Sequence, residues 1–466
     1  MLKEYLMPES KGLHYLRDKI FFCLISAKNE EYKGYKVYNI AVESQSHQDQ
    51  IISLKNDVLD FWRLPSFEHG TTGKVMVPPS HSDWFEDQLT TLGLEKDIHI
   101  EDVHEYLTKA ENKIKRVRYD TDYIGDYDDD NSGDGNYEID DSQPDSQPDT
   151  PFDIKAYHRY DDILKYLESL EEKYKDFNVN FDVVQYGITE QNRKLFHIKL
   201  TNAASTASRT AKPIVVVEAA INPRDWITVP AALNVVDQVL DHNKFLEDLE
   251  WIIIPVTNPD GYEYTHTNLR LWTKSRSTRS NLGIICPGVN INRNFDLDWL
   301  HFDSSSSPCS HLYAGVEAFS EIEAQMIKDI IQENKSRIKL YISLQNNGGY
   351  ISYPWNYERA ASGMFRQHHL LGLEMVKSMN NPYKLGVGST IFDRASGTSS
   401  DYARDNDILY TFNIDVVQSD DGVVIPEKDI GEIIEDVWNA IAVAADEMIK
   451  LYVSDSGQNT NSVNEL

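Results

Sequence analysis

The spacing of apolar and polar residues predicts a small α+β domain in the N-terminal quarter of the chain. Three segments alternate with the two-residue period of a half-buried strand: 35–42, 74–78 and 98–103. Two segments between them carry apolar residues at helical spacing: 47–62 and 80–93. The order strand, helix, strand, helix, strand predicts one compact α+β domain over residues 31–119.

The longer C-terminal part shows continuous apolar runs, which are typical of strands buried on both faces. These runs are 195–200, 213–218, 251–256, 338–344 and 408–414. Helical periodicity occurs before, between and after them, at 157–174, 229–240 and 429–452. Apolar strands that alternate with helices predict an α/β domain over residues 153–453, with a mixed, largely parallel sheet flanked by helices.

An acidic, low-complexity stretch at residues 120–152 separates the two predicted domains. Residues 120–149 contain eleven Asp and one Glu but no Lys or Arg, and Ser-Gln-Pro-Asp occurs twice. This composition predicts a disordered linker, because it cannot bury enough apolar surface to fold. We expect a separate N-terminal segment at 1–30 and a polar tail at 454–466. The apolar run at 20–27 fits either a weak signal-peptide core or a partly buried strand, so no clear signal peptide is predicted.

Composition supports a large folded protein and argues against two kinds of partner. The 466 residues are 41% hydrophobic, which supplies enough apolar surface for large packed cores. The 45 basic and 75 acidic side chains give a net charge of −30, which would repel a nucleic acid backbone. Every apolar run is interrupted before it reaches the roughly 18–20 residues of a membrane span. We therefore expect neither a nucleic-acid partner nor a membrane span.

Six motifs in the C-terminal part carry the main functional information, since H-E-x-x-H, G-x-S-x-G and P-loop signatures are absent. The motifs are Asn-Pro-Asp-Gly-Tyr at 258–262, Arg-Leu-Trp at 270–272, Gly-Val-Asn-Ile-Asn-Arg-Asn at 288–294, Ser-Ser-Pro-Cys-Ser at 306–310, Ala-Phe-Ser-Glu at 318–321 and Tyr-Pro at 353–354. Together they resemble zinc carboxypeptidases of the digestive type. The first domain resembles the propeptide of that family, which masks the active cleft. The resemblance implies a carboxypeptidase-like fold preceded by a propeptide-like domain.

The positions that hold zinc in the resembled family carry different residues here. The family motif His-x-x-Glu is replaced by Asn222 and Asp225, and the third ligand, a histidine, by Gln345. Zinc in proteins favours imidazole nitrogen and thiolate sulfur. The resemblance therefore leads us to expect no bound zinc and no other cofactor.

The catalytic positions of the resembled family have changed as well. Asp415 stands in place of the general-base glutamate and is one methylene shorter, and Thr273 replaces the arginine that stabilises the oxyanion. Asp393 aligns with the substrate-capping tyrosine. We therefore expect a catalytically inactive member of the family, not an enzyme. Two alternatives stay open: an active metallocarboxypeptidase with an atypical metal site, and a structural or interaction protein with an empty cleft.

In the resembled family an Asn-Arg motif grips the peptide's C-terminal carboxylate, and Asn292 and Arg293 stand in that motif here. Arg224 and Arg270 also lie on family positions, and we expect all four residues to bind substrate. Because the guanidinium fork donates two parallel hydrogen bonds to a carboxylate, peptide or protein C-termini are the expected partners. Alternatively, these arginines pair with internal carboxylates such as Asp225 or Asp415. Ser400 stands at the specificity-pocket position, so no charge is expected at the base of that pocket.

The resemblance also implies a disulfide and a cellular location. Cys286 and Cys309 fall on both positions of a disulfide in the resembled family, which leaves Cys23 unpaired. A disulfide implies the secretory pathway, and Asn334 lies in a glycosylation sequon. Within the family, the chain resembles a fungal group of inactive metallocarboxypeptidase-like proteins associated with cell-wall organisation. That resemblance implies a vacuolar or extracellular protein, which we expect to be monomeric.

Overall fold

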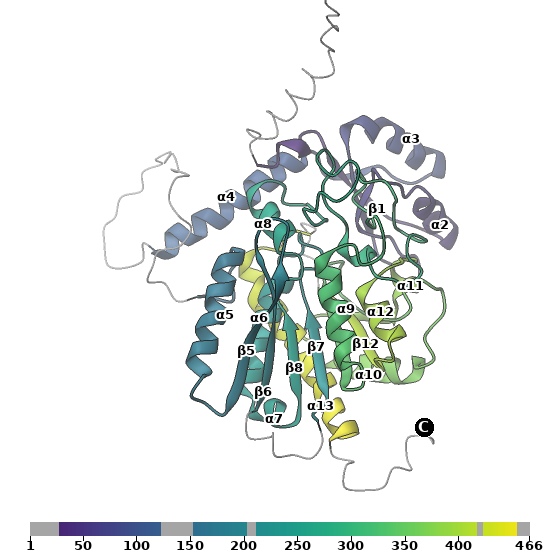
Figure 1. Ribbon diagram of the computed structural model, residues 1–466. Helices are drawn as coiled ribbons and strands as arrows, with labels where there is room; N and C mark the ends of the chain where they lie inside the picture. Colours follow the sequence, from purple (N-terminus) through teal and green to yellow (C-terminus); the bar gives the residue numbers. More distant parts are fainter. Residues whose placement is uncertain (1–27, 123–151, 203–210, 417–422, 454–466) are drawn as a thin grey trace, which may run out of the picture.

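The computed structural model describes residues 28–122, 152–202, 211–416 and 423–453. Most of the predicted acidic linker, the apolar run at 20–27, Cys23 and the polar tail lie outside these residues. Figure 1 shows the N-terminal unit, in purple, above one end of the larger C-terminal unit. Among the described helices, none has the length and apolar character that crossing a membrane requires.

The N-terminal unit is a four-stranded antiparallel sheet with helices packed against it. Its elements are β1 (Lys36–Ile40), α2 (Gln45–Ser53), β2 (Asp60–Arg63), β3 (Gly73–Val77), α3 (Ser82–Leu92), β4 (Asp97–Ile100) and α4 (Val103–Asp122). The strand order is β2-β3-β1-β4. Tyr38, Val75 and Phe85 are fully buried between the sheet and α3, so the alternating pattern read from the sequence does mark the core face.

The predicted helix at 47–62 is wrong in its second half. Helix α2 ends at Ser53, because the side chain of Asn56 accepts the backbone N–H groups of Val58 and Leu59 and turns the chain. The residues that follow form the edge strand β2.

Helix α4 was not predicted, although Asp102, whose side chain accepts the N–H of Glu105, is an ordinary helix-capping signal.

The C-terminal unit is built on an eight-stranded mixed sheet, which confirms the predicted fold class. Its strands are β5 (Val179–Ile188), β6 (Lys194–Asn202), β7 (Ile214–Glu218), β8 (Glu250–Ile254), β9 (Ile338–Gln345), β10 (Tyr350–Tyr353), β11 (Lys384–Val387) and β12 (Tyr410–Asp415). Their order is β11-β10-β12-β9-β7-β8-β6-β5. The four central strands β12, β9, β7 and β8 are parallel to one another, while β5, β6 and β10 introduce antiparallel pairs.

Helices cover both faces of this sheet. They are α5 (Tyr160–Tyr174), α6 (Thr228–Asp241), α7 (Asn243–Asp248), α8 (Pro259–Thr267), α9 (Ile322–Asn334), α10 (Phe365–Ser378), α11 (Gly388–Ile391), α12 (Ser399–Asp405) and α13 (Glu427–Tyr452). Val215 and Val217 of β7 pack in the core formed with α5, α6, α10 and α13, whereas Ile214 and Val216 pack in the core formed with α9 and α12. The continuous apolar run follows from this burial on both faces.

Parallel central strands place the loops that follow them at one edge of the sheet. Strands β7, β9 and β12 end at Glu218, Gln345 and Asp415. In open α/β sheets, sites lie at the carboxyl ends of the strands, so this edge is where a site is expected.

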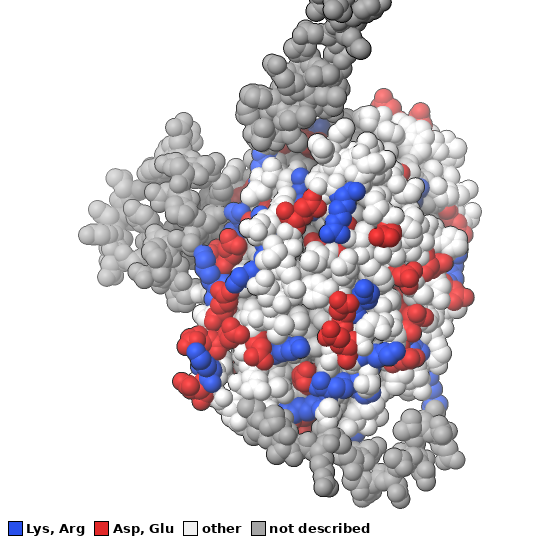
Figure 2. Space-filling view, in the orientation of Figure 1, with Lys and Arg blue, Asp and Glu red and all other residues white. Residues whose placement is uncertain are grey.

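On the face shown in Figure 2, Lys and Arg lie interspersed with Asp and Glu, and that face offers no broad basic patch for a nucleic acid.

Candidate functional site

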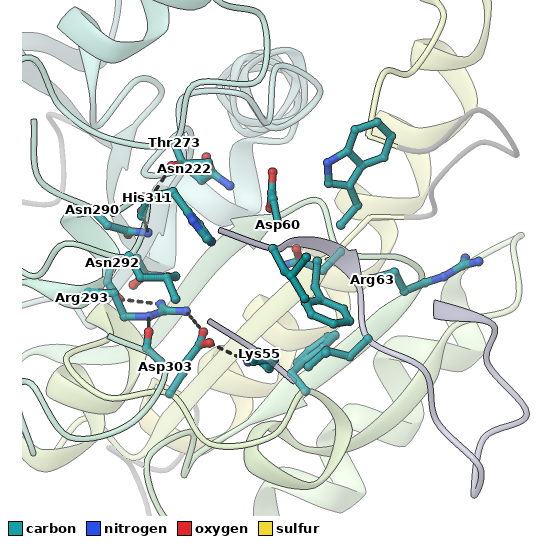
Figure 3. A pocket seen from close by; sticks show the side chains of 18 of the residues that line it. Lys55, Asp60, Arg63, Asn222, Thr273, Asn290, Asn292, Arg293, Asp303 and His311 are labelled. Atoms are coloured by element: carbon teal, nitrogen blue, oxygen red, sulfur yellow. Dashed lines mark hydrogen bonds and ion pairs between the residues drawn. The ribbon is translucent and has the colours of Figure 1, made fainter. Parts of the chain in front are cut away.

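A cavity of about 180 Å³ lies between the N-terminal domain and the loops at the carboxyl ends of β7 and β9 (Figure 3). The predicted site residues that line it are Asn222, Arg224, Thr273, Asn292, Arg293 and Gln345. Lys55 and Asp60 of the N-terminal domain also line it. The cavity is therefore a cleft of the C-terminal domain over which the N-terminal domain is seated.

The residues at the metal positions come together at the edge of the sheet. Gln345 lies directly across from Asp415 in the register of β9 and β12, and the carboxylate of Asp225 accepts the backbone N–H of Asn346. The buried Oδ1 of Asn222 and Oδ2 of Asp225 have no hydrogen-bond partner among the described residues. The structure thus brings two carboxylates and two amides into one cluster.

The loop after β7 is fixed by Thr228 at the start of α6. Its Oγ1 accepts the N–H of Ala220 at 3.0 Å and donates to the carbonyl oxygen of Asp225 at 2.7 Å. Ala220 has a φ of 48°, which turns the chain sharply at the end of the strand. These bonds hold Asn222 and Asp225 at the cleft.

Burial shifts both carboxyl groups of the cluster toward the neutral form. It raises the pKa of Asp225 to about 6, although Arg224 and Arg270 act in the opposite direction. It also raises the pKa of Asp415 to about 7, while a hydrogen bond from Asn347 opposes the shift and the charge of Asp225 adds to it. The two groups therefore share an interior site with little compensating positive charge.

Arg293 binds an internal carboxylate that the sequence did not indicate. It ends a short 3-10 turn (Ile291–Arg293), and its Nη2 lies 2.6 Å from Oδ2 of Asp303, while its Nε donates to the Asp303 carbonyl oxygen at 2.7 Å. Nζ of Lys55, from the N-terminal domain, lies 2.5 Å from the other oxygen of Asp303. Burial opposes ionisation, but the charges of Lys55 and Arg293 lower the pKa of Asp303 to about 2. Figure 3 shows this three-residue network.

Arg224 binds a carboxylate of the N-terminal domain. Its Nη1 forms an ion pair with Oδ2 of Asp60, and both side chains are largely buried.

Arg270 forms no ion pair with a carboxylate in the described part of the chain and instead supports the backbone of the cleft. Its guanidinium stacks 3.8 Å from the ring centre of Trp226 and donates to the carbonyl oxygen of Arg224 at 2.6 Å. Arg270 is 2% exposed and therefore supports the loop that carries Arg224.

The carboxylates that meet these arginines differ from those that the sequence suggested. Asp225 and Asp415 were the expected internal partners, whereas Arg293 and Arg224 are paired with Asp303 and Asp60. For Arg224, no local sequence pattern could have shown the partner, because Asp60 reaches the cleft only when the two domains are in contact.

Asn292 and Thr273 also form contacts within the protein. Oδ1 of Asn292 accepts the backbone N–H of Ser399 at 3.0 Å, and Oγ1 of Thr273 donates to the carbonyl oxygen of His311 at 3.3 Å. Both residues line the cavity.

Asp393 and Ser400, which the family resemblance also singled out, have hydrogen-bond partners within the protein. Asp393 pairs with the exposed Arg359 at 2.9 Å. Ser400 Oγ accepts the side-chain N–H of Asn356 at 3.1 Å, and Asp401 beside it accepts the backbone N–H of Asn356. Asp401 therefore caps a turn.

The predicted disulfide is confirmed, since Cys286 and Cys309 are bonded. Asn334 ends α9 and is partly buried, and its side-chain nitrogen donates to the carbonyl oxygen of Ile330 at 3.0 Å. Its glycosylation stays a prediction.

Comparisons with known proteins agree with this fold. A family model described as zinc carboxypeptidase matches residues 163–440, and one described as carboxypeptidase activation peptide matches residues 38–110. Carboxypeptidase B of Helicoverpa zea is 30% identical over 439 residues, with 91% of this chain and 96% of that protein covered. Carboxypeptidase B of Rattus norvegicus is 26% identical over 450 residues, with 91% and 96% covered. The crystal structure of carboxypeptidase A from Helicoverpa armigera matches with a TM-score of 0.79 and 27% identity, covering 91% of this chain and 100% of that one. The chain therefore belongs to the zinc carboxypeptidase family and carries its activation-peptide domain.

Family membership corrects two predictions made from the sequence. The prediction that the chain is not an enzyme is wrong, because the family and the relatives above are named carboxypeptidases. The prediction that no cofactor is involved is also wrong, because the matching family is described as zinc carboxypeptidase. The exchanged side chains alone were not sufficient grounds for either prediction.

The side chains at the metal positions do not match the usual ligands of zinc. Structural and catalytic zinc sites use imidazole, thiolate and carboxylate groups. Asn222, Asp225 and Gln345 supply amides and one carboxylate, and the unpartnered atoms of Asn222 and Asp225 are oxygens. No reaction step through zinc follows from these residues.

Proposed function

We propose that the cleft binds the C-terminal carboxylate of a peptide through Arg224, Asn292 and Arg293. The observation that carries this proposal is that both arginines already hold a carboxylate, Arg224 that of Asp60 and Arg293 that of Asp303. A shielded guanidinium that binds one carboxylate is suited to bind another, because the fork geometry and the charge are the same.

The N-terminal domain competes with the peptide in this proposal. Asp60 occupies Arg224, and Lys55 holds Asp303 on Arg293. Removing or displacing the N-terminal domain would take Asp60 away from Arg224, whereas Arg293 would keep Asp303 as its partner. Arg224 is then the first contact for an entering carboxylate, and Arg293 becomes available as Asp303 moves aside.

Calorimetry on paired peptides tests the proposal in the full chain. The Asp60→Asn variant frees Arg224 while the N-terminal domain stays attached. In this variant, free-acid peptides should bind on the order of ten- to a hundredfold more tightly than their C-terminal amides, since a charge-assisted hydrogen bond contributes roughly 1.5–3 kcal/mol. Adding Arg293→Ala should reduce this difference, and adding Arg366→Ala, at an exposed position of α10, should preserve it. Equal affinities for acid and amide forms would contradict the proposal.

A second candidate function is removal of the peptide's last residue at the same cleft. It is favoured by the family names and by the position of Asp415, whose carboxylate stands across from Gln345 at the edge of the sheet. Mass spectrometry of peptides incubated with the protein would detect shortening by one residue. Shortening that persists in Asp415→Asn would exclude a role of Asp415 in the reaction.

We also propose that the protein enters the secretory pathway as a glycosylated monomer and acts in the vacuole or outside the cell, in cell-wall organisation. The Cys286–Cys309 disulfide supports an oxidising compartment. The resemblance of the sequence to a fungal group associated with cell-wall organisation supports the proposed location and the proposed role in the cell wall. A mobility shift on endoglycosidase treatment that disappears in Asn334→Gln would support the modification, and sedimentation would report the oligomeric state.

A further inference from the structure

The cluster of Asn222, Asp225, Gln345 and Asp415 contains oxygen atoms whose hydrogen-bonding capacity is not used by the protein. Oδ1 of Asn222 and Oδ2 of Asp225 are buried and have no partner in the described part of the chain. Gln345 is 7% exposed, and its Nε2 donates to Ser343 Oγ at 2.8 Å, which leaves its Oε1 as the acceptor. Buried polar atoms are normally satisfied, so unsatisfied oxygens grouped at one cleft point to a ligand that accepts their lone pairs.

The charge of the cluster favours a cation. Asp225 and Asp415 are each 2% exposed, and in the described part of the chain neither forms a salt bridge. The nearest arginines form their hydrogen bonds with other groups. Arg224 donates to Asp60, and Arg270 donates to the carbonyl oxygen of Arg224. Buried carboxylates are ordinarily paired or bound to a metal. A divalent cation would neutralise both.

The donor atoms decide which cation fits. Within the ranges that the structure describes, no three His, Cys, Asp or Glu side chains are arranged to hold a metal, so the amide oxygens of Asn222 and Gln345 are required. Carboxylate, carbonyl and water oxygens suit Ca²⁺, Mg²⁺ and Mn²⁺, whereas zinc favours nitrogen and sulfur. The adjoining cavity of about 180 Å³ has room for water molecules that would complete the coordination.

We infer that the metal position of this chain takes a hard, oxygen-preferring divalent cation in place of zinc. Asn222, Asp225 and Gln345 supply the oxygens, and Asp415 supplies further negative charge. The family's metal position is thereby kept, with its selectivity changed. The inference is independent of peptide binding, because the metal can be measured alone.

Titration of the full chain with metal ions tests this inference. After chelation and dialysis, the protein should bind one Mn²⁺, detected by electron paramagnetic resonance and calorimetry, with Ca²⁺ or Mg²⁺ competing. Mn²⁺ should bind at least tenfold more tightly than Zn²⁺. Asp225→Asn should weaken Mn²⁺ binding at least tenfold, and Asp329→Asn, at a surface position on α9, should leave it unchanged.

A second variant keeps the test decisive if Asp225→Asn does not fold. Replacing the three positions together, as Asn222→His, Asp225→Glu and Gln345→His, should reverse the preference so that Zn²⁺ binds more tightly than Mn²⁺. Three results would overturn the inference: no stoichiometric Mn²⁺ in the natural protein, tighter binding of Zn²⁺ than of Mn²⁺, or unchanged selectivity in the folded triple variant.

Discussion

Asp60 of the N-terminal domain and Arg224 of the C-terminal domain form a buried ion pair across the cleft, with side-chain exposures of 11% and 7%. Breaking a buried pair by removing one partner leaves an uncompensated charge and costs about 3–5 kcal/mol. We therefore predict that Asp60→Asn and Arg224→Gln each destabilise the contact between the domains, and that their effects are not additive. A double-mutant cycle by urea denaturation should give a coupling free energy of about 1–3 kcal/mol.

The exposed pair of Lys244 and Asp446 is the matched control for that cycle. Their side chains are 55% and 41% exposed. Exposed pairs typically contribute about 0.2–1 kcal/mol, and the coupling here should lie at the low end. Equal coupling in the two cycles would show that the contact across the cleft is no stronger than a surface pair.

Asp303 allows one part of the pH dependence of stability to be assigned to one carboxylate. Although burial opposes its ionisation, Lys55 and Arg293 lower its pKa from 3.8 to about 2. A carboxylate whose pKa is lower in the folded state stabilises the fold above its unfolded-state pKa and loses this effect as the pH falls toward the folded-state value. The stabilisation by Asp303 should therefore be constant above about pH 5 and disappear between about pH 4 and pH 2.

Urea denaturation of the natural protein and of Asp303→Asn over this pH range measures that contribution. The difference in unfolding free energy between them should shrink as the pH falls below about 4. Asp182→Asn, at an exposed position of β5, should give a difference near zero throughout. A difference for Asp303→Asn that does not change with pH would contradict the assignment.

His197 and His368 make the protein sensitive to milder acid. Burial lowers the pKa of both rings from 6.5 to about 4. Between about pH 6.5 and pH 4 these two rings bind protons in the unfolded chain but not in the folded chain. They therefore lower the stability as the pH falls through this range. Neither ring nitrogen of His197 has a hydrogen-bond partner among the described residues, so leucine can replace it without losing a bond.

The variant His197→Leu should take up about one proton fewer on unfolding near pH 5 than the natural protein. Comparing unfolding free energies at closely spaced pH values measures this uptake. An unaltered uptake in His197→Leu would mean that His197 is already protonated in the fold at pH 5.

Gly397 fixes the backbone beside Arg293. Its φ is +68°, and a Cβ atom at this position would lie 2.5 Å from the carbonyl oxygen of Arg293. Gly397→Ala should therefore destabilise the fold by about 1–3 kcal/mol and weaken binding of free-acid peptides. Gly363→Ala is the control, since no atom lies within 4 Å of its Cβ position, and it should change stability by less than about 0.5 kcal/mol. A similar loss in both variants would argue against a special role for Gly397.

The sequence predicted the central strands of the large sheet well and its edges poorly. Runs such as the one in β7 are continuous because both faces of the strand are buried. Strands β5 and β11 lie at the two edges of the sheet and β10 has only four residues, so their patterns are mixed or short and were not recognised. Tertiary pairing forms these strands, and a local pattern does not contain it.

The candidate site was predictable only where it follows family motifs. Asn222, Gln345 and Arg293 were found because they replace or retain residues in such motifs, and the structure places all three at one cavity. Asp303 and Asp60 belong to no motif. Asp303 pairs with Arg293 inside the C-terminal domain, whereas Asp60 meets Arg224 only where the two domains are in contact.

In the proposed function Asp60 and a peptide carboxylate compete for Arg224, and one comparison measures this competition most directly. Calorimetry would give the affinities of one peptide, as the free acid and as the amide, for the natural chain and for Asp60→Asn. We predict that Asp60→Asn tightens binding of the free acid by on the order of tenfold or more and leaves binding of the amide nearly unchanged. An equal gain for both forms, or no gain for either, would contradict competition between Asp60 and the peptide carboxylate for Arg224.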